Sequence, residues 1–244
     1  MDCIQYGSTE IHYEIVRGKR KRTVAIRLDP QSAVTVLAPK GLADGKIRMI
    51  VHKKARWIIR RQAQIRELSR AYPGKQYIDG ESFPYLGRHY RLKVTPTNAA
   101  QAPACGLRGG RLRVEIRAGL SGKESRTAVK QAVREWYWRR AEEKIRERLP
   151  RFAGQLGVQA AAIEIRDQKR RWGSCSRSGI LRFNWRIVAA PVAVLDYLLV
   201  HELCHLIHPD HSRRFWNKVQ ILIPDFEKKR VLLKEHGLIA GQLG

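Results

Sequence analysis

The chain has 244 residues, enough for one large domain or two small ones with a substantial hydrophobic core. Its composition, with 43% hydrophobic residues and six tryptophans, is that of a globular protein rather than of a disordered or fibrous one. The formal net charge of +26 is unusual and predicts attraction to polyanions, most simply non-specific binding of DNA or RNA, although charge alone says nothing about fold.

The cysteines and the apolar segments indicate where the protein works. The chain contains four widely spaced cysteines and no C-x-x-C pair: Cys3, Cys105, Cys175 and Cys204. This spacing favours a reduced intracellular protein over a disulfide scaffold. The first ten residues carry no apolar signal core, and the apolar run 187–207 is interrupted by Pro191, Asp196 and Glu202. We therefore expect a cytoplasmic protein with no membrane partner.

The first half of the chain reads mainly as strands. Alternating or β-branched runs predict strands over residues 11–16, 23–28 and 33–37, and again over 77–83, 85–95 and 111–116. Between these groups, residues 43–69 predict a helix with one apolar and one strongly basic face. The basic face is a candidate nucleic-acid surface, but an ordinary core helix with a solvated exterior is the simpler interpretation.

The second half reads mainly as helices. Ser121 and Glu124 have the spacing of a capping box, and the helix that they open is expected to end at Pro150. Further helices are predicted over 192–207, 212–222 and 225–236, with Gly237 as the final cap. The sequence thus predicts an α+β fold, divided into a strand-rich region 1–120 for substrate or partner binding and a catalytic region 121–244.

The predicted helix 192–207 carries the sequence His201-Glu202-Leu203-Cys204-His205, an H-E-x-x-H motif. Residues four apart share a helix face, so His201 and His205 can hold one ion, while Glu202 can reach a water on that ion. Two imidazoles for Zn²⁺ and a carboxylate as general base are what metal-assisted hydrolysis requires. The competing interpretation, two core histidines and a surface glutamate, is disfavoured because four of the eight histidines fall within residues 201–211.

The third ligand is a choice between His208 and His211. His208 lies seven residues after His201, about 10.5 Å along a helix, which is too far for a compact tetrahedral site. Pro209 also disfavours helical geometry at His208. A turn at Pro209-Asp210 would return His211 to the ion, so we predict His211 as the ligand. Its spacing equals that of the metzincin pattern, but His208 stands where metzincins have glycine, so their turn is not assumed.

The region 165–217 carries a series of short motifs: Arg171-Trp172-Gly173-Ser174-Cys175, Gly179, Leu181, Asn184, Pro191, Asp196-Tyr197, His201 to His205, His211-Ser212 and Phe215-Trp216. Together these residues closely resemble the YgjP-like metallopeptidases, which are related to the SprT-like zinc proteases. It implies a zincin-like catalytic domain in which His201, His205 and His211 bind Zn²⁺ and Glu202 is the catalytic base.

The resemblance also implies that the W-G-S-C stretch borders a cleft in which a sheet edge holds an extended peptide. Trp172 and Gly173 are therefore candidate substrate-binding residues, and a core tryptophan packed on a close-approach glycine is the equally weighted alternative. A further donor to the oxyanion is expected, with Arg171 and Tyr197 among the candidates.

The leading hypothesis is a zinc metalloendopeptidase that hydrolyses peptide bonds with metal-activated water and Glu202 as general base. The main alternative is a nucleic-acid-associated protein with a structural or non-proteolytic zinc site. A structural site would need Cys175, Cys204 or His208 as its fourth ligand. The two combine in a protease recruited to DNA or RNA. A non-protease hydrolase with the same zinc site is a third interpretation.

Overall fold

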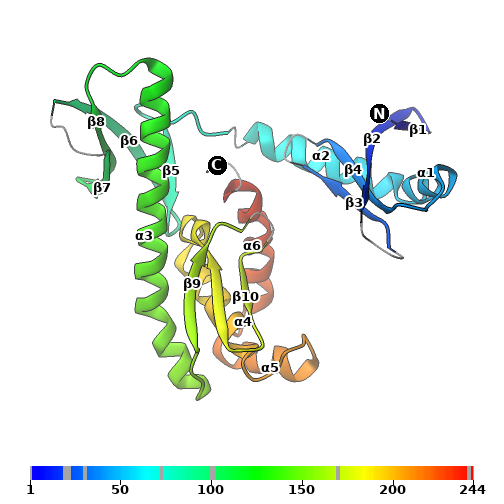
Figure 1. Cartoon of the computed structure of the whole chain (residues 1–244). Coiled ribbons are helices and arrows are strands. Elements are labelled where there is room, and N and C mark those ends of the chain that lie inside the picture. Colours follow the sequence, from blue (N-terminus) through cyan, green and yellow to red (C-terminus); the bar gives the residue numbers. More distant parts are fainter. Residues whose placement is uncertain are drawn as a thin grey trace. The chain divides into compact units, whose positions relative to one another are not determined.

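The computed structural model describes residues 2–18, 23–29, 32–71, 74–98, 103–168, 171–240 and 243. The chain forms two compact units, Met1–Gly74 and Lys75–Gly244, and each unit has a hydrophobic core of its own. The fold is mixed α+β, with strands concentrated in the first half and helices in the second, as predicted (Figure 1). None of the helices in the described ranges combines the length and the apolarity that a membrane crossing needs.

The first unit is a four-stranded sheet followed by two helices. Its elements are β1 (Asp2–Tyr6), β2 (Thr9–Gly18), β3 (Ala25–Leu28), β4 (Val34–Pro39), α1 (Asp44–Lys53) and α2 (Ala55–Ala71). The sheet order is β1-β2-β4-β3, and β2 and β4 are parallel. Alternation along β4 buries Val34 and Val36 on one face, where they share a core with Ile47 of α1 and Ile58 of α2.

The single helix predicted over residues 43–69 is wrong in one respect, because it is broken at Lys54. Lys54 has φ −100° and ψ 3°, and α2 starts at the next residue. The buried residues Ile47, Val51, Ala55 and Ile58 nevertheless keep helical spacing across the break. The hydrophobic pattern therefore gave no sign that the helix is interrupted.

The second unit begins with a sheet of the same topology as the first. Its strands are β5 (Ser82–Tyr85), β6 (Arg88–Thr97), β7 (Ala104–Arg108) and β8 (Arg111–Arg117), in the order β5-β6-β8-β7 with β6 and β8 parallel. Each sheet thus consists of two antiparallel strand pairs, and the inner strands of the two pairs run parallel to each other. In the sequence, each sheet is followed by a helix. The sequence shows only a loose recurrence of strands followed by a helix, because the two halves differ residue by residue.

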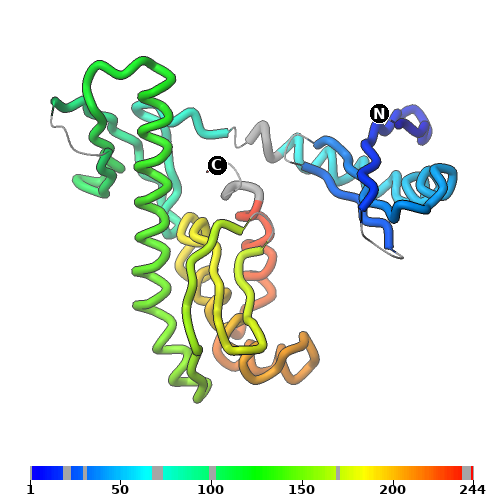
Figure 2. The backbone as a smooth tube through the Cα atoms, in the orientation of Figure 1, coloured from blue at the N-terminus to red at the C-terminus, as the bar shows by residue number. Residues whose placement is uncertain are grey.

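The long helix α3 (Gly122–Leu156) connects this sheet to the rest of the unit (Figure 2). The predicted capping box is confirmed, since Ser121 Oγ accepts from the Glu124 N–H and the Glu124 carboxylate accepts from the Ser121 N–H. The predicted end at Pro150 is wrong. Pro150 is exposed, while Leu149 and Phe152 on either side of it are buried. Pro150 lacks the N–H of a regular helical residue, but it lies on the solvent-exposed face. The packing of its buried neighbours keeps the helix continuous.

The remaining elements form the region that contains the H-E-x-x-H motif. They are β9 (Ala162–Arg166), β10 (Gly173–Cys175), β11 (Ile180–Asn184), the 3₁₀ helix η1 (Trp185–Ala189), α4 (Val192–Cys204), α5 (Arg213–Leu222) and α6 (Phe226–Ala240). The sheet order is β10-β11-β9, so β10 is an edge strand. The helices match the prediction except at their ends: α4 stops three residues earlier than expected, and α6 continues through Gly237.

The boundary expected near residue 120 falls inside the second unit. Residues from the sheet β5–β8, such as Phe83 and Leu112, share one continuous core with Val133 of α3 and Leu198 of α4. The compact division lies at residue 74 instead, and each of the two resulting units has a hydrophobic core of its own. The assignment of substrate binding to the strand-rich part stays a prediction.

An ion pair fixes α4 against α3, and its removal tests the scaffold. Arg148 Nε and Nη2 donate to the two carboxylate oxygens of Asp196 at 2.6 and 2.7 Å, and both side chains are largely buried. We expect Asp196→Asn to lower the free energy of unfolding by about 1.5–3 kcal/mol, the value of a charge-assisted hydrogen bond. Urea denaturation would measure it. The control Glu143→Gln removes an exposed pair with Arg140 and should change stability by under about 0.5 kcal/mol; equal losses would contradict the prediction.

Candidate metal centre and catalytic site

Helix α4 presents the first two histidines and the glutamate of the motif. The helix is buried along most of its length, and Glu202 is only 4% exposed. His201 lies in the last turn, and His205 is the C-cap, still with helical dihedral angles of φ −68° and ψ −17°. The His201 and His205 rings are therefore neighbours, with centroids 4.9 Å apart. The helical face that the sequence predicted is confirmed.

A turn after α4 brings in the third histidine. The His208 N–H donates to the Cys204 carbonyl, and the Ser212 N–H donates to Oδ1 of Asp210, which closes the turn. His211 Nε2 then lies 3.1 Å from His201 Nε2. The ligand atoms of His201, His205 and His211 all lie within 4.8 Å of one another. The structure thus brings together the three histidines that the sequence analysis selected.

His208 has a different place in this arrangement. Its side chain is not in the histidine group, but its backbone carbonyl accepts a hydrogen bond of 3.1 Å from Nδ1–H of His205. This bond holds the proton on Nδ1, so Nε2 of His205 keeps its lone pair for a ligand. The role of His208 as an orienting carbonyl leaves no signal in the sequence, because any residue at this position supplies the same atom.

The geometry of the histidine group fits a metal ion. Two nitrogens that bind one tetrahedral Zn²⁺ at about 2.0–2.1 Å lie about 3.3 Å apart, close to the 3.1 Å between the His201 and His211 nitrogens. Burial lowers the pKa of His201 to about 3, aided by the positive charges of His205, His211 and Arg230. Burial likewise lowers the pKa of His205. Neutral imidazoles are the form that binds metal.

Aromatic side chains from α5 support the histidines. The Phe215 ring lies 5.0 Å or less from each of the three histidine rings. The Trp216 indole stacks on His211 at 5.5 Å and also on Phe226 of α6 at 5.1 Å. Phe215 and Trp216 belong to the motif recognised in the sequence, but their packing role depends on the turn that returns the chain to α4.

Glu202 lies against the backbone of β10. A Cβ atom built on Gly173 would lie 2.5 Å from Oε1 of Glu202, so only glycine leaves room for this carboxylate. Burial raises the pKa of Glu202 to about 8, and the Arg171 guanidinium opposes that shift. Among the described residues, Oε2 of Glu202 has no hydrogen-bond partner. A cation bound at the histidines would favour the carboxylate form.

The close contact at Gly173 gives a prediction. Gly173→Ala should displace Glu202 by a distance on the order of 1 Å and lower kcat/KM for peptide hydrolysis about 10²-fold, without loss of bound metal. The matched control is Gly154→Ala in α3, where the added methyl group meets nothing within 4 Å. Peptide cleavage and metal content of both variants would be measured. Full activity in Gly173→Ala would show that the contact between residue 173 and the Glu202 carboxylate does not limit the rate of hydrolysis.

Trp172 lies beside Gly173, but its indole is directed towards α6. Its Nε1–H donates to the Leu233 carbonyl at 3.0 Å, and the side chain is partly buried. The backbone carbonyl of Trp172 accepts from the Asn184 N–H at 2.7 Å. The structure therefore gives the indole a packing role, whereas Gly173 lies beside the Glu202 carboxylate. Contact of either residue with substrate stays a prediction.

The other residues considered at this site are placed as follows. Cys204 is buried and Cys175 is partly buried, and neither joins the histidine group. The Tyr197 ring lies 5.9 Å from the His201 ring, and burial raises the Tyr197 pKa to about 12. Arg171 is exposed and close enough to Glu202 to act on its pKa. Sequence reasoning did not include Arg230, whose guanidinium lies over the Trp216 ring.

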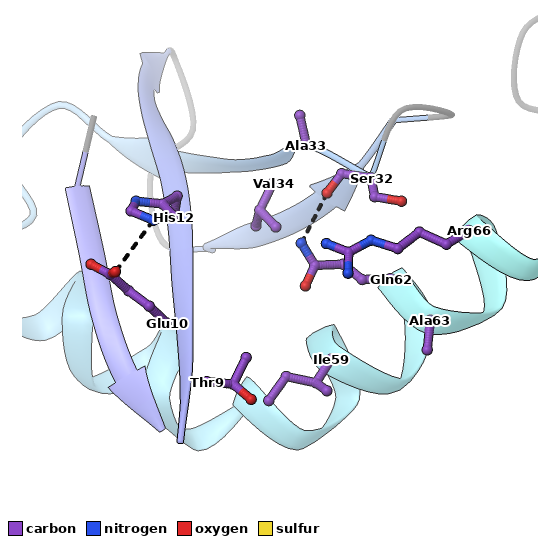
Figure 3. A pocket seen from close by; sticks show the side chains of 10 residues that line it. All are labelled: Thr9, Glu10, His12, Ser32, Ala33, Val34, Ile59, Gln62, Ala63 and Arg66. Carbon is purple, nitrogen blue, oxygen red and sulfur yellow. Dashed lines mark hydrogen bonds and ion pairs between the residues drawn. The ribbon is translucent and has the colours of Figure 1, made fainter. Parts of the chain in front are cut away.

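The first unit contains a second group of ligand-type residues and a pocket. Cys3, Glu10 and His12 lie on the hairpin β1–β2 and are all exposed. Glu10 and His12 also line a pocket of about 400 Å³, between the sheet and α2, together with Gln62 and Arg66 (Figure 3). Arg48 adds positive charge beside Cys3. This group lacks the buried carboxylate and the aromatic support that surround the three histidines.

Comparison with known proteins identifies the family of the chain. A family model described as "YgjP-like, metallopeptidase domain" matches residues 22–236. A solved structure, the metallopeptidase zymogen abylysin of Pyrococcus abyssi, is 24% identical, with 37% of this chain and 93% of that chain covered and a TM-score of 0.34. A search of curated proteins found no match. Since the family model spans most of the sequence, the chain belongs to the YgjP-like metallopeptidase family.

Proposed function

We propose that the protein is a zinc-dependent endopeptidase with a zincin-like catalytic region and a site built on H-E-x-x-H. One observation carries the proposal: three histidine ligand atoms lie within 4.8 Å of one another, next to a buried glutamate. Three protein ligands leave one tetrahedral position open, as in catalytic zinc sites, whereas structural sites use four. The group of described residues includes neither Cys175, Cys204 nor His208, and this disfavours the closed alternative.

Each residue of the site has a proposed task. His201, His205 and His211 hold the ion, and the His208 carbonyl orients His205. Bound Zn²⁺ would acidify a water molecule and polarise the scissile carbonyl. Glu202 accepts the proton of that water at one carboxylate oxygen and donates it to the leaving amine, which is general base and then general acid catalysis. The contact with Gly173 limits where this carboxylate can lie.

The edge strand β10 offers a place for the peptide. Among the described strands, β10 pairs only with β11, so its outer edge has free backbone groups beside Glu202. An extended peptide can pair with such an edge, which binds the main chain and leaves selectivity to side chains. We propose that the substrate adds to β10 as a further strand, with the scissile bond next to the histidines.

The test is cleavage of an unstructured protein such as β-casein by purified full-length protein. We expect fragments that disappear after treatment with a chelator and return when Zn²⁺ is added back. Mass spectrometry of the new termini would show that peptide bonds are hydrolysed. A metal-loaded, folded protein that cleaves neither casein nor a random peptide library would refute the proposal and favour another zinc hydrolase.

We further propose that α2 recruits the protease to nucleic acid, because an exposed aromatic lies among cations on this helix. Trp57 is 48% exposed, and Arg60 and Arg61 follow it by three and four residues on α2. Positions three and four apart are neighbours on a helix surface. A tryptophan surrounded by positive charges suits single-stranded DNA or RNA, whose bases stack while the phosphates pair.

Binding of a fluorescein-labelled 20-nucleotide single strand, followed by anisotropy, tests the recruitment. We expect Trp57→Ala to weaken binding about tenfold, the value of one stacked base, and affinity to fall steeply with salt. The control Lys123→Ala removes an exposed charge from the second unit. Competition by poly-glutamate as effective as by DNA, or no difference between the two variants, would contradict a nucleic-acid site at Trp57.

The proposed location is the cytoplasm. None of the four cysteines forms a disulfide, and Cys204 is buried at the end of α4. Reduced thiols are usual in that compartment. A fluorescent fusion expressed in the source cells, followed by fractionation, would locate the protein.

A further inference from the structure

Arg230 of α6 lies near the candidate metal centre, and the Trp216 indole contacts both its guanidinium and the His201 ring. Its guanidinium carbon lies 5.2 Å from the Trp216 ring centroid, and that ring lies 5.8 Å from the His201 ring. Guanidinium and imidazole are therefore no more than about 11 Å apart. At 3.3–3.4 Å per residue, this separation corresponds to about three residues of extended peptide.

The position of Arg230 is held by packing on α6. Phe226, one turn earlier, also stacks on the Trp216 indole, at 5.1 Å with an interplanar angle of 17°. Further along α6, the Leu233 carbonyl accepts from the Trp172 indole at 3.0 Å. The helix is thus anchored to α5 and to the segment before β10. An arginine on such a helix has a defined location, which a loop residue would lack.

Arg230 has no anionic partner among the residues that the structure describes, although it is partly buried. Other partly buried arginines of this unit do have one: Arg148 pairs with Asp196 and Arg182 with Glu164. On α6 itself, Lys229 pairs with Asp225, and Glu227 is exposed. The guanidinium also acts on the pKa of His201 and of Tyr197, so its charge reaches the metal centre.

A planar guanidinium presents five N–H donors and matches a carboxylate with two parallel hydrogen bonds. Packing against the indole face removes water from one side of it and leaves its edge for such a ligand. We propose that Arg230 binds a carboxylate of the substrate peptide, within about three residues of the scissile bond. The carboxylate is either an Asp or Glu side chain or the terminal carboxylate of the chain. This inference rests on the proposed peptidase function and defines its substrate class.

The experiment uses full-length, zinc-loaded protein and pairs of fluorogenic peptides. One series carries Glu or Gln at each of the three positions on either side of the scissile bond, and a second series ends in a free acid or an amide. We expect the wild type to prefer one charged member at least about tenfold in kcat/KM, as a charge-assisted bidentate bond implies. A preference in the first series would identify the bound carboxylate as an Asp or Glu side chain. A preference in the second series would identify it as the terminal carboxylate.

Variants of Arg230 then assign the preference. In Arg230→Gln the kcat/KM ratio for the preferred pair should fall to about one, because the charged peptide loses the guanidinium that binds its carboxylate. Arg230→Lys should keep part of the preference, because the charge remains but the fork is lost. The control Lys228→Gln removes a charge from an exposed position on the same helix and should keep the full ratio.

Charge reversal separates a binding role from a structural one. Arg230→Glu should prefer a peptide with Lys at the selected position, an outcome that packing on Trp216 cannot produce. The inference is overturned if the wild type does not discriminate within any pair, or if Arg230→Gln lowers cleavage of both members alike. Thermal unfolding of each variant shows whether it folds, and Arg230→Lys covers the case in which Arg230→Gln does not.

Failure of the proposed function has a different signature. If the zinc-loaded protein cleaves no peptide, the same labelled pairs are titrated against it and binding is read by anisotropy. A preference for the acidic member that Arg230→Gln abolishes would then support the carboxylate site and reject peptidase activity. Equal binding of both members would overturn the inference itself.

Discussion

Replacement of Glu202 by glutamine is expected to lower peptide hydrolysis at least about 10²–10⁴-fold, the contribution of a positioned general base. Glutamine has nearly the same shape as glutamate, so the close contact with Gly173 is preserved. It cannot accept a proton from water at neutral pH. The three histidines are unchanged, and the variant should still bind one zinc ion per chain.

The measurement combines kcat/KM on a cleavable peptide with metal content of the same preparation. The control Glu135→Gln changes an exposed glutamate on α3 in the same way and should retain wild-type activity. Activity of Glu202→Gln equal to wild type would mean that another group removes the proton. Loss of zinc together with activity would mean that Glu202 holds the metal site together, so its role as a base would remain undemonstrated by this variant.

The local geometry of the metal centre could be predicted because it depends on helical periodicity and on one proline. His201 and His205 share a face on any α-helix, and the rise between His201 and His208 separates these two residues. The choice of His211 followed from these constraints, and the structure places its ring with the other two. The orienting carbonyl of His208 depends on the path of the turn, which the residue types do not specify.

The parts that could not be predicted depend on tertiary packing. Pro150 is a helix-ending signal, but the buried Leu149 and Phe152 hold α3 together on both sides of it. The break at Lys54 leaves the apolar spacing intact, so the pattern could not reveal it. Arg230 lies 29 residues after His201 in the sequence and approaches the site only because α6 packs on α4 and Trp216. Nothing in the sequence around a basic residue on an amphipathic helix indicates that a metal centre lies nearby.

The resemblance to a family predicted more than spacing did, and Gly173 shows why. In the sequence, Gly173 is one of 19 glycines. The structure shows that any side chain at this position would overlap the Glu202 carboxylate. The resemblance implied that the W-G-S-C stretch borders a cleft, but it did not assign separate roles to Trp172 and Gly173. The geometry separates the two, since the Trp172 indole is hydrogen-bonded to α6 and Gly173 lies against the Glu202 carboxylate.

Replacement of His211 by alanine is expected to abolish tight zinc binding, whereas His208→Ala should keep one zinc ion per chain. His211 supplies a ring nitrogen to the group, and His208 supplies a backbone carbonyl that alanine retains. Binding to the folded state alone stabilises it by about 2.7 kcal/mol when free zinc is 100 times Kd. The unfolding midpoint of wild type and His208→Ala should therefore rise with zinc, and that of His211→Ala should not.

Zinc per chain after dialysis, and thermal unfolding with zinc or chelator, would be measured for the three proteins. The opposite result, zinc lost in His208→Ala and kept in His211→Ala, would require the His208 ring to reach the ion. That geometry needs a different path at Pro209-Asp210, in which the Ser212 N–H no longer bonds Asp210. It would also remove the hydrogen bond that holds the proton of His205 on Nδ1. The metal centre proposed here thus depends on this turn as much as on helix α4.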